Sequence, residues 1–418
     1  EWVRLNDVTD EIIDCPHSTP TYTQHGDFFI ARTQDFRDGS LNLTEAARVD
    51  GNTFDERTKR ATPTYGDIIY SREGAYHGIA AEIPEGAKVC LGQRTVLIRP
   101  DDTKASFRFL RYWLNYDRVR DYVAGHRAGS AAPRINLPTI RGLPVALPPL
   151  CEQQAIAEIL GGLDAKIELN RRMNETLESL ARSLFKSWFV DFDPVRAKMD
   201  GRPPTGLPPA TAALFPDSFH ESDFGKVPCG WEAGKVRDVA SLSRSGLNPG
   251  DFPNESFDHF SLPAFDTGRT ANVELGSSIK SNKFVVGPDC VLLSKLNPHI
   301  PRIWRPTLRT SNRPVCSTEF MVVSPTSRSS RDFLYSQFTD SAFASVYGTL
   351  VTGTTGSHQR IRPESFLDIQ IVLPPKSIVA AFSAIAGTFF GRASRNTIES
   401  QTLAALRDTL LPRLLSGE

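Results

Sequence analysis

The chain has 418 residues, enough for two or three domains, and 40% hydrophobic and 23% charged residues, a composition typical of a folded globular protein. Its 48 basic and 48 acidic residues give a formal net charge of zero, which counts against a uniformly basic nucleic-acid coat protein but allows basic residues to gather on one face. The six cysteines lie far apart without a CxxC pair, so we expect reduced thiols rather than a zinc ribbon. No stretch resembles a signal peptide or reaches the ~20 apolar residues of a membrane span, so we expect a cytoplasmic protein with no membrane contact.

Residues 1–147 predict a β-rich domain. Apolar and β-branched runs at 67–71 and 95–98 lie between turns rich in Gly and Pro, as strands do. A short helix is expected to follow them, at residues 106–123.

A long helix is predicted for residues 148–190. Pro148 and Pro149 open it, since proline is tolerated only in a first turn, and the apolar residues that follow alternate spacings of four and three. These positions are Ile156, Leu160, Leu163, Ile167, Leu177, Ala181, Leu184 and Trp188, with Asn170 and Asn174 in the two intervening slots. This heptad seam predicts a coiled coil in which a buried asparagine can fix the register. The alternative is a helix that merely covers its own sheet.

Residues 191–230, rich in Pro and in acidic residues, predict an extended connector, after which the chain repeats itself. Four anchors of the first module return in the same order at offsets of 224 to 229 residues: Trp2 as Trp231, Phe109-Leu110 as Phe333-Leu334, Arg134-Ile135 as Arg360-Ile361, and Leu147-Pro148-Pro149 as Leu373-Pro374-Pro375. We therefore expect a second β-rich domain at 231–372, with strands at 290–294 and 320–323 and a helix at 331–347.

A second long helix at 373–418 completes the repeat. Its seam is Phe382, Ala386, Phe389, Ala393, Asn396, Leu403, Leu410 and Leu414. The predicted fold class is α+β, in which two β-rich domains are each followed by a long helix.

Catalytic and metal-binding motifs are missing from the sequence. It contains no GxxxxGK phosphate loop, no Asn-Pro-Pro-aromatic tetrapeptide that would hold a flipped adenine, and no HExxH. Asp164 and Lys166 have a spacing seen in nucleases, but they lie within the heptad pattern, so we interpret them as a solvated or partner-facing pair. We predict no catalytic residue and no metal site.

Basic residues are concentrated in corresponding parts of the two modules. Residues 94–141 hold ten Arg or Lys against four acidic residues, and residues 291–365 hold nine against four. Two DNA-binding faces would produce this excess, although an ordinary solvated surface is the alternative.

Several segments resemble one protein family. Residues 147–172, LPPLCEQQAIAEILGGLDAKIELNRR, and residues 184–204, LFKSWFVDFDPVRAKMDGRPP, are similar to the central conserved region of the specificity subunits of Type I restriction-modification systems. Residues 210–231 resemble the entry to their second target-recognition domain. The resemblance covers nearly the whole chain. The second module departs from it where CEQQ at 151–154 becomes SIVA at 377–380, which puts partner contacts of the second helix in doubt.

The resemblance implies sequence-specific DNA recognition of a bipartite target by a non-catalytic subunit. The two long helices would pair as an antiparallel coiled coil with pseudo-twofold symmetry and set the spacer between half-sites. Two modification (methyltransferase) subunits would dock on them and restriction/translocase subunits would join, so S-adenosylmethionine, ATP and Mg²⁺ are expected on partners and no cofactor on this chain. Alternatives are a stand-alone DNA-binding scaffold or regulator, and a nuclease with an unrecognised site.

Loop residues with side chains suited to base edges are the predicted DNA-binding set, since Arg pairs best with guanine and Asn or Gln with adenine. Each of them could instead contact only phosphate or water. The set is Arg32, Gln34, Arg72, Tyr76, His77 and Arg134 in the first module, and Lys295, Asn297, His299, Arg302, His358, Gln359 and Arg360 in the second.

Overall fold

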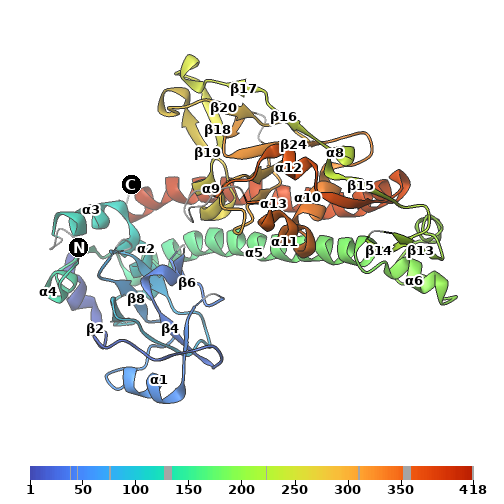
Figure 1. Ribbon diagram of the computed structural model, residues 1–418. Helices are drawn as coiled ribbons and strands as arrows, with labels where there is room; N and C mark the ends of the chain where they lie inside the picture. Colours follow the sequence, from blue (N-terminus) through green and yellow to red (C-terminus); the bar gives the residue numbers. More distant parts are fainter. Residues whose placement is uncertain are drawn as a thin grey trace. The chain divides into compact units, whose positions relative to one another are not determined.

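The computed structural model describes the chain except for residues 38, 45, 75–76, 127–133, 223, 309–310, 352–358 and 417–418. The chain forms two compact units. Unit 1 is Glu1–Leu169 together with Glu399–Glu418, and unit 2 is Asn170–Ile398 (Figure 1). Two long helices, α5 (Leu150–Phe189) and α13 (Lys376–Ser416), contribute one half each to either unit.

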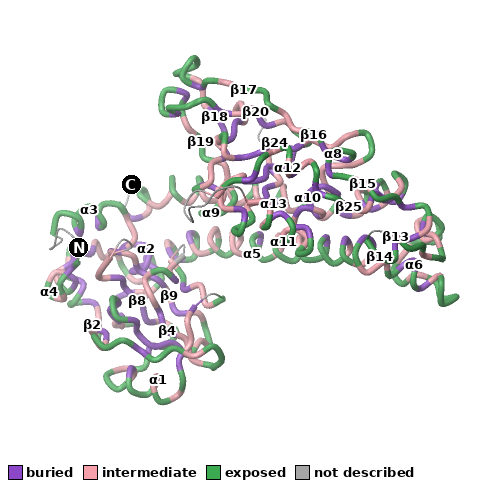
Figure 2. The backbone as a smooth tube through the Cα atoms, in the orientation of Figure 1, coloured by how far each residue is buried: buried purple, intermediate pink, exposed green. Residues whose placement is uncertain are grey.

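Unit 1 is built on two sheets. A six-stranded sheet has the order β2 (Thr9–Asp14), β11 (Thr95–Pro100), β8 (Ile68–Ser71), β9 (Ala80–Glu82), β6 (Ser40–Leu41) and β5 (Phe36–Arg37). A four-stranded sheet has the order β10 (Val89–Leu91), β4 (Phe28–Ala31), β7 (Arg48–Val49) and β3 (Tyr22–Thr23), and β1 (Trp2–Arg4) pairs with β12 (Pro144–Ala146). The helices are α1 (Gly51–Arg57), α2 (Phe107–Asn115), α3 (Asp117–Gly125) and α4 (Leu137–Arg141). Strands β8 and β11 are almost entirely buried, which explains their continuous apolar sequence (Figure 2).

Unit 2 repeats this plan with its own two sheets. One has the order β16 (Ala240–Ser243), β24 (Phe320–Pro325), β21 (Val291–Ser294) and β22 (Ile303–Trp304), and the other β17 (Gly246–Leu247), β20 (Lys283–Val285), β23 (Arg313–Ser317), β18 (Ser256–Phe260) and β19 (Asn272–Leu275). Strand β15 (Glu232–Lys235) pairs with β25 (Gln370–Leu373). The helices are α8 (Val236–Val239), α9 (Leu262–Gly268), α10 (Arg331–Thr339), α11 (Ser341–Thr349) and α12 (Pro363–Leu367).

The internal repeat is visible in the strand pairing. The order β2-β11-β8 of unit 1 recurs as β16-β24-β21 in unit 2, and the parallel pair β4–β10 recurs as β18–β23. The mixed α+β fold is therefore confirmed. Each predicted short helix is in fact two helices, because Tyr116 and Asp340 adopt extended backbone angles between them. The Asp340 side chain accepts a hydrogen bond from the backbone N–H of Ala342 and caps the second helix of its pair.

The two long helices pair in antiparallel fashion within each unit. All the predicted heptad positions are buried or half-buried. In unit 1, Asp164 and Lys166 of α5 form ion pairs with Arg407 and Glu399 of α13, at 2.8 and 3.5 Å. In unit 2, the ring of Phe185, further along α5, packs against Phe382, which comes earlier on α13. Residues later in α5 therefore contact residues earlier in α13, as expected for an antiparallel pair.

Helix α13 is, by length and composition alone, apolar enough to cross a membrane. In unit 2 its apolar side chains lie in the core. Ile378, Phe382 and Ala386 are fully buried there, together with residues of α5 and α10. We interpret its hydropathy as that of a core helix.

The connector differs from the expectation, because it is folded rather than extended. It contains α6 (Asp193–Met199), α7 (Pro209–Ala212) and a hairpin of β13 (Phe219–Ser222) and β14 (Gly225–Pro228). Val195, Phe215 and Val227 are buried in the core of unit 2, and the Phe215 ring meets the Trp188 ring edge-on at 5.0 Å. The prolines open short helices here instead of extending the chain, since Pro194 and Pro209 lie in first turns.

Candidate nucleic-acid interface

Three segments of unit 1 meet at one corner of the six-stranded sheet. The backbone N–H of Arg72, which follows β8, donates to the carbonyl of Arg94, which precedes β11 (2.9 Å). The N–H of Ile135 donates to the carbonyl of Arg72 (2.8 Å), and Arg134 forms an isolated β-bridge with Glu73. We call Arg72, Arg94 and Arg134 the unit 1 corner. The side chains of Arg94 and Arg134 are exposed there.

Unit 2 builds the same corner with the same backbone bonds. The N–H of Lys295, which follows β21, donates to the carbonyl of Glu319, which precedes β24 (2.8 Å). The N–H of Ile361 donates to the carbonyl of Lys295 (3.1 Å), and Arg360 bridges to Leu296. Lys295, Glu319 and Arg360 form the unit 2 corner. Each corner thus brings together predicted residues that lie more than sixty positions apart in the sequence.

Ion pairs set the electrostatics of the two corners. In unit 1 the Nη1 of Arg72 lies 2.5 Å from the Asp14 carboxylate, while its Nε is buried with no hydrogen-bond partner among the described residues. In unit 2 the Arg360 guanidinium holds Glu319 with two bonds, Nε to Oε2 at 3.1 Å and Nη2 to Oε1 at 2.7 Å. Burial lowers the pKa of Lys295, and the neighbouring Arg360 charge adds to this, whereas Glu319 opposes it.

The remaining predicted residues of unit 1 lie around the same corner. Arg32 forms a bidentate pair with Asp35 (2.9 and 2.8 Å), and Gln34 is exposed in the turn after β4. This turn is joined to the corner, because the N–H of Gly92 donates to the carbonyl of Ala31. The Nδ1 of His77 lies 2.8 Å from the Gly74 carbonyl. Tyr76 lies outside the described residues.

In unit 2 the predicted residues divide into two groups. The N–H of Asn297 donates to the carbonyl of Gln359 beside the corner, and Asn297 has a left-handed backbone with φ of 50°. His299 is exposed in the same turn. Arg302 instead holds Asp266 of α9 with two bonds of 2.7 and 2.9 Å, so its side chain is engaged away from the corner. His358 lies outside the described residues.

Comparison with known proteins finds one family. Residues 5–179 match the family model described as the Type I restriction modification DNA specificity domain. The chain is 27% identical to the Type I restriction enzyme HindI specificity subunit of Haemophilus influenzae, over 84% of this chain and 86% of the relative. It is 25% identical to the Type I restriction enzyme MjaIX specificity subunit of Methanocaldococcus jannaschii, over 97% and 87%. Over residues 5–179 the chain carries this specificity domain, and over most of its length it is similar to Type I specificity subunits.

A solved structure supports the same fold. The S subunit of a Type I restriction-modification system from M. genitalium aligns with this chain at a TM-score of 0.58 and 14% identity, covering 99% of this chain and 96% of that one. The resemblance predicted from residues 147–204 is therefore confirmed. The relatives are specificity subunits, which are the non-catalytic recognition subunits of Type I restriction-modification systems.

The sequence did not single out two of the corner residues, Arg94 and Glu319. Each directly precedes a predicted strand, β11 or β24, so aligning the two modules on these strand starts would have paired them. The basic excess of residues 94–141 included Arg94 but did not single it out.

Asp164, considered above for its nuclease-like spacing, is a structural residue of unit 1. Its carboxylate accepts bonds from Arg111 Nη1 (3.2 Å), the Tyr112 hydroxyl (2.6 Å) and Arg407 Nη1 (2.8 Å). The prediction that Asp164 belongs to a solvated or partner-facing pair is therefore wrong, because its side chain is only 19% exposed. Among the described residues, no group of three His, Cys, Asp or Glu side chains could hold a metal ion.

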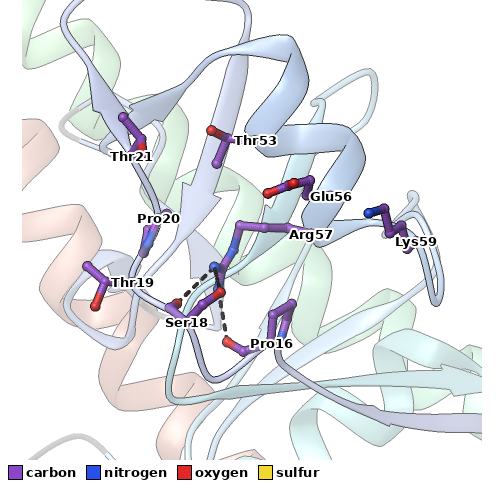
Figure 3. Close-up of a pocket in the computed structure, with 9 residues that line it drawn as sticks. All are labelled: Pro16, Ser18, Thr19, Pro20, Thr21, Thr53, Glu56, Arg57 and Lys59. Atoms are coloured by element: carbon purple, nitrogen blue, oxygen red, sulfur yellow. Dashed lines mark hydrogen bonds between the residues drawn. The ribbon is translucent and has the colours of Figure 1, made fainter.

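A cavity of about 250 Å³ in unit 1 lies beside α1, and none of the residues predicted to bind DNA lines it (Figure 3). Its buried Arg57 donates to the main-chain carbonyls of Leu91 (2.9 Å), Ser18 (3.0 Å) and Pro16 (3.2 Å). Because these donors are engaged by the backbone, we interpret Arg57 as a clamp for the loop that contains Pro16 and Ser18.

Proposed function

We propose that this specificity subunit reads a bipartite DNA target, one half-site with each unit. Residues 1–147 and 231–372 would be the two target-recognition domains. The observation that carries the proposal is the corner built twice with the same backbone hydrogen bonds, each bearing an exposed arginine from the return segment, Arg134 or Arg360. A pseudo-twofold repeat in one chain fits a target with two separated half-sites, as dimer symmetry does in other DNA-binding proteins.

The chemistry of the predicted residues fits base reading in the major groove. Arginine forms bidentate bonds with guanine O6 and N7, and Gln34, Asn297 and Gln359 have the amide groups that suit adenine. Residues already held in ion pairs, such as Arg32 and Arg302, have their guanidinium groups oriented by Asp35 and Asp266. Their assignment to DNA remains part of the proposal.

Methylation of adenine and restriction would be carried out by partners. Two modification subunits would dock on the long helices and bring S-adenosylmethionine, and restriction subunits would add ATP-driven translocation and Mg²⁺-dependent cleavage. Both helices also carry exposed apolar side chains that such partners could cover. They are Ile159, Leu169 and Leu180 on α5, and Ile398 and Leu406 on α13, each 42–53% exposed.

Co-purification followed by target selection tests this function. The tagged chain, expressed with its modification subunit, should bring that subunit down and select two conserved sequence blocks with an unread spacer from a randomised duplex library. One contiguous block would exclude bipartite reading. A homodimer without partner would favour a regulator, and Mg²⁺-dependent cleavage by the chain alone would favour a nuclease. The chain alone is expected to show no methyltransferase, ATPase or nuclease activity.

A further inference from the structure

The two corners carry opposite charges at one equivalent position. The residue whose carbonyl receives the corner N–H bond is Arg94 in unit 1 and Glu319 in unit 2. The return arginine is present in both units, where Arg134 bridges to Glu73 and Arg360 bridges to Leu296 through the backbone. Unit 2 therefore has an acid where unit 1 has Arg94, and unit 1 has Glu73 where unit 2 has Leu296.

In unit 2 this acid fixes the return arginine. Both carboxylate oxygens of Glu319 accept from the Arg360 fork, a bidentate geometry that sets the plane of the guanidinium. The Arg360 side chain is 53% exposed and that of Glu319 is 27% exposed. The guanidinium therefore faces solvent, while the less exposed carboxylate sets its orientation. The carboxylate also offsets the guanidinium charge, which reduces its attraction for a phosphate at any position along DNA.

In unit 1 the corresponding arginine has no such clamp. Within the part of the chain that the structure describes, Arg94 and Arg134 form no ion pair, and both are exposed. Two exposed positive charges that no carboxylate holds in an ion pair suit the phosphate backbone, which requires charge but little geometric precision.

We propose that Glu319 is a specificity-determining, positioning residue: it orients Arg360 to recognise a base edge, whereas Arg134 contacts phosphate. The inference rests on the proposed DNA-binding function and assigns different tasks to two arginines that the repeat makes equivalent. Unit 2 gains sequence discrimination because Glu319 already orders the Arg360 side chain in the free protein, so less conformational entropy is lost when DNA binds. Unit 1 gains affinity that depends on charge alone.

The test compares three variants of the complete complex with its modification subunits. The probes are the duplex that the wild-type complex selects from a randomised library and a random duplex of equal length, measured over a series of salt concentrations. Arg134→Ala should weaken binding to both duplexes by the same factor. It should also reduce by about one the slope of the logarithm of affinity against the logarithm of salt concentration, the salt slope. Arg360→Ala should lower the affinity for the selected duplex about tenfold or more and leave the affinity for the random duplex nearly unchanged.

Glu319→Gln is the decisive variant, because it removes the charge with little change of shape. It should strengthen binding to the random duplex, weaken binding to the selected duplex, and raise the salt slope by about one. The reciprocal variant Arg94→Glu should lower the affinity for random duplex by introducing a clamp for Arg134. Unchanged thermal unfolding would confirm that each variant is folded.

Two results would overturn the inference: an unchanged ratio of selected to random affinity in Glu319→Gln, or an equal loss on both duplexes in Arg360→Ala. If the wild-type complex itself shows no preference for the selected duplex, the proposed function fails instead. The two failures are therefore distinguishable.

Discussion

Asp164 joins three helices of unit 1 through one carboxylate. Arg111 and Tyr112 reach it from α2, and Arg407 reaches it from α13. Arg111 is almost fully buried and also pairs with Glu82 at 2.8 Å, so the cluster is a network rather than an isolated pair. It attaches the β-rich part of unit 1 to its own half of the helix pair.

Asp164→Ala is expected to destabilise unit 1 by about 3 kcal/mol, since removing one partner leaves buried cations uncompensated. Denaturant unfolding of the full chain would measure the loss. Glu158→Ala, at an exposed position of the same helix, is the control and should change the free energy of unfolding by less than about 0.5 kcal/mol. Equal effects of the two substitutions would show that the carboxylate contributes nothing through its partners.

The cysteines differ sharply in environment. Burial raises the pKa of the Cys15, Cys90 and Cys290 thiols to about 11 and also raises that of Cys316. Because the thiolate is the reactive form, their reactivity near pH 8 should be about a hundredfold below that of a thiol at the ordinary value of 9.0. Cys151 is exposed at the start of α5.

Alkylation of the native chain at pH 8 should therefore modify Cys151 first and the half-buried Cys229 more slowly. The four buried cysteines should react only after unfolding. Peptide mass spectrometry after brief treatment with iodoacetamide measures the order. Early modification of Cys290 in the folded chain would contradict the burial of that strand start.

At the scale of elements, the connector is part of the unit 2 core. Phe215 is 1% exposed and packs edge-on against Trp188 near the end of α5. The Lys198 side chain also donates to the Phe215 carbonyl, which ties α6 to the segment after α7. Such packing holds the segment between the two predicted domains in a defined path.

Phe215→Ala should cost about 3–5 kcal/mol in the free energy of unfolding, the range for removing a fully buried aromatic side chain. Leu214→Ala is a matched control at the neighbouring position, where the side chain is 37% exposed, and should cost much less. Thermal and denaturant unfolding of both variants would measure the difference. A loss below about 1 kcal/mol for Phe215→Ala would mean that the connector is an independent linker.

At the scale of the whole molecule, both long helices pass from one unit into the other, at 169/170 and at 398/399. The fully buried Asn170 and Asn396 lie directly beside these boundaries in sequence, and Asn170 Nδ2 donates to the Asn396 carbonyl (3.4 Å). A buried polar residue in a heptad seam fixes the register of the pair. We infer that the helix pair acts as a ruler for the spacer of the target.

Inserting one heptad beside Asn170 and another beside Asn396 should change the selected spacer while each half-site keeps its base preferences. Seven residues add about 10 Å of helix, the length of about three base pairs. The DNA also turns by roughly a third of a turn over that length, so loss of binding would show that the twist cannot be absorbed. Selection from a library with randomised spacers measures the outcome.

The control is an insertion of seven residues after the exposed Gly206 of the connector, which should leave the spacer unchanged. An unchanged spacer with full affinity after both helix insertions would mean that the helices are not the ruler.

The sequence alone determined the features that depend on local periodicity. The heptad spacing of residues 148–190 and 373–418 predicted both long helices, because helical faces follow from a repeat of 3.5 to 3.6 residues whatever the surroundings. The four repeated anchors predicted two modules, and the apolar runs at 67–71 and 320–323 predicted central strands. The resemblance to Type I specificity subunits followed from the motif at 147–172, which lies largely within a run of local sequence.

Only the tertiary structure decided which side chains meet. Gln153, expected in a partner-binding motif, is buried and holds the backbone of Ser106 and Lys104, while its counterpart Val379 packs in an apolar core. The pairing of Arg360 with Glu319 spans 41 positions and follows from strand register, to which no local pattern points. Hydrophobic periodicity fixes the face of an element, but the partner of a charged group depends on which distant strand end the fold brings beside it. The sequence thus supplied the architecture and the family, whereas the division of tasks between Arg134 and Arg360 rests on contacts that exist only after folding.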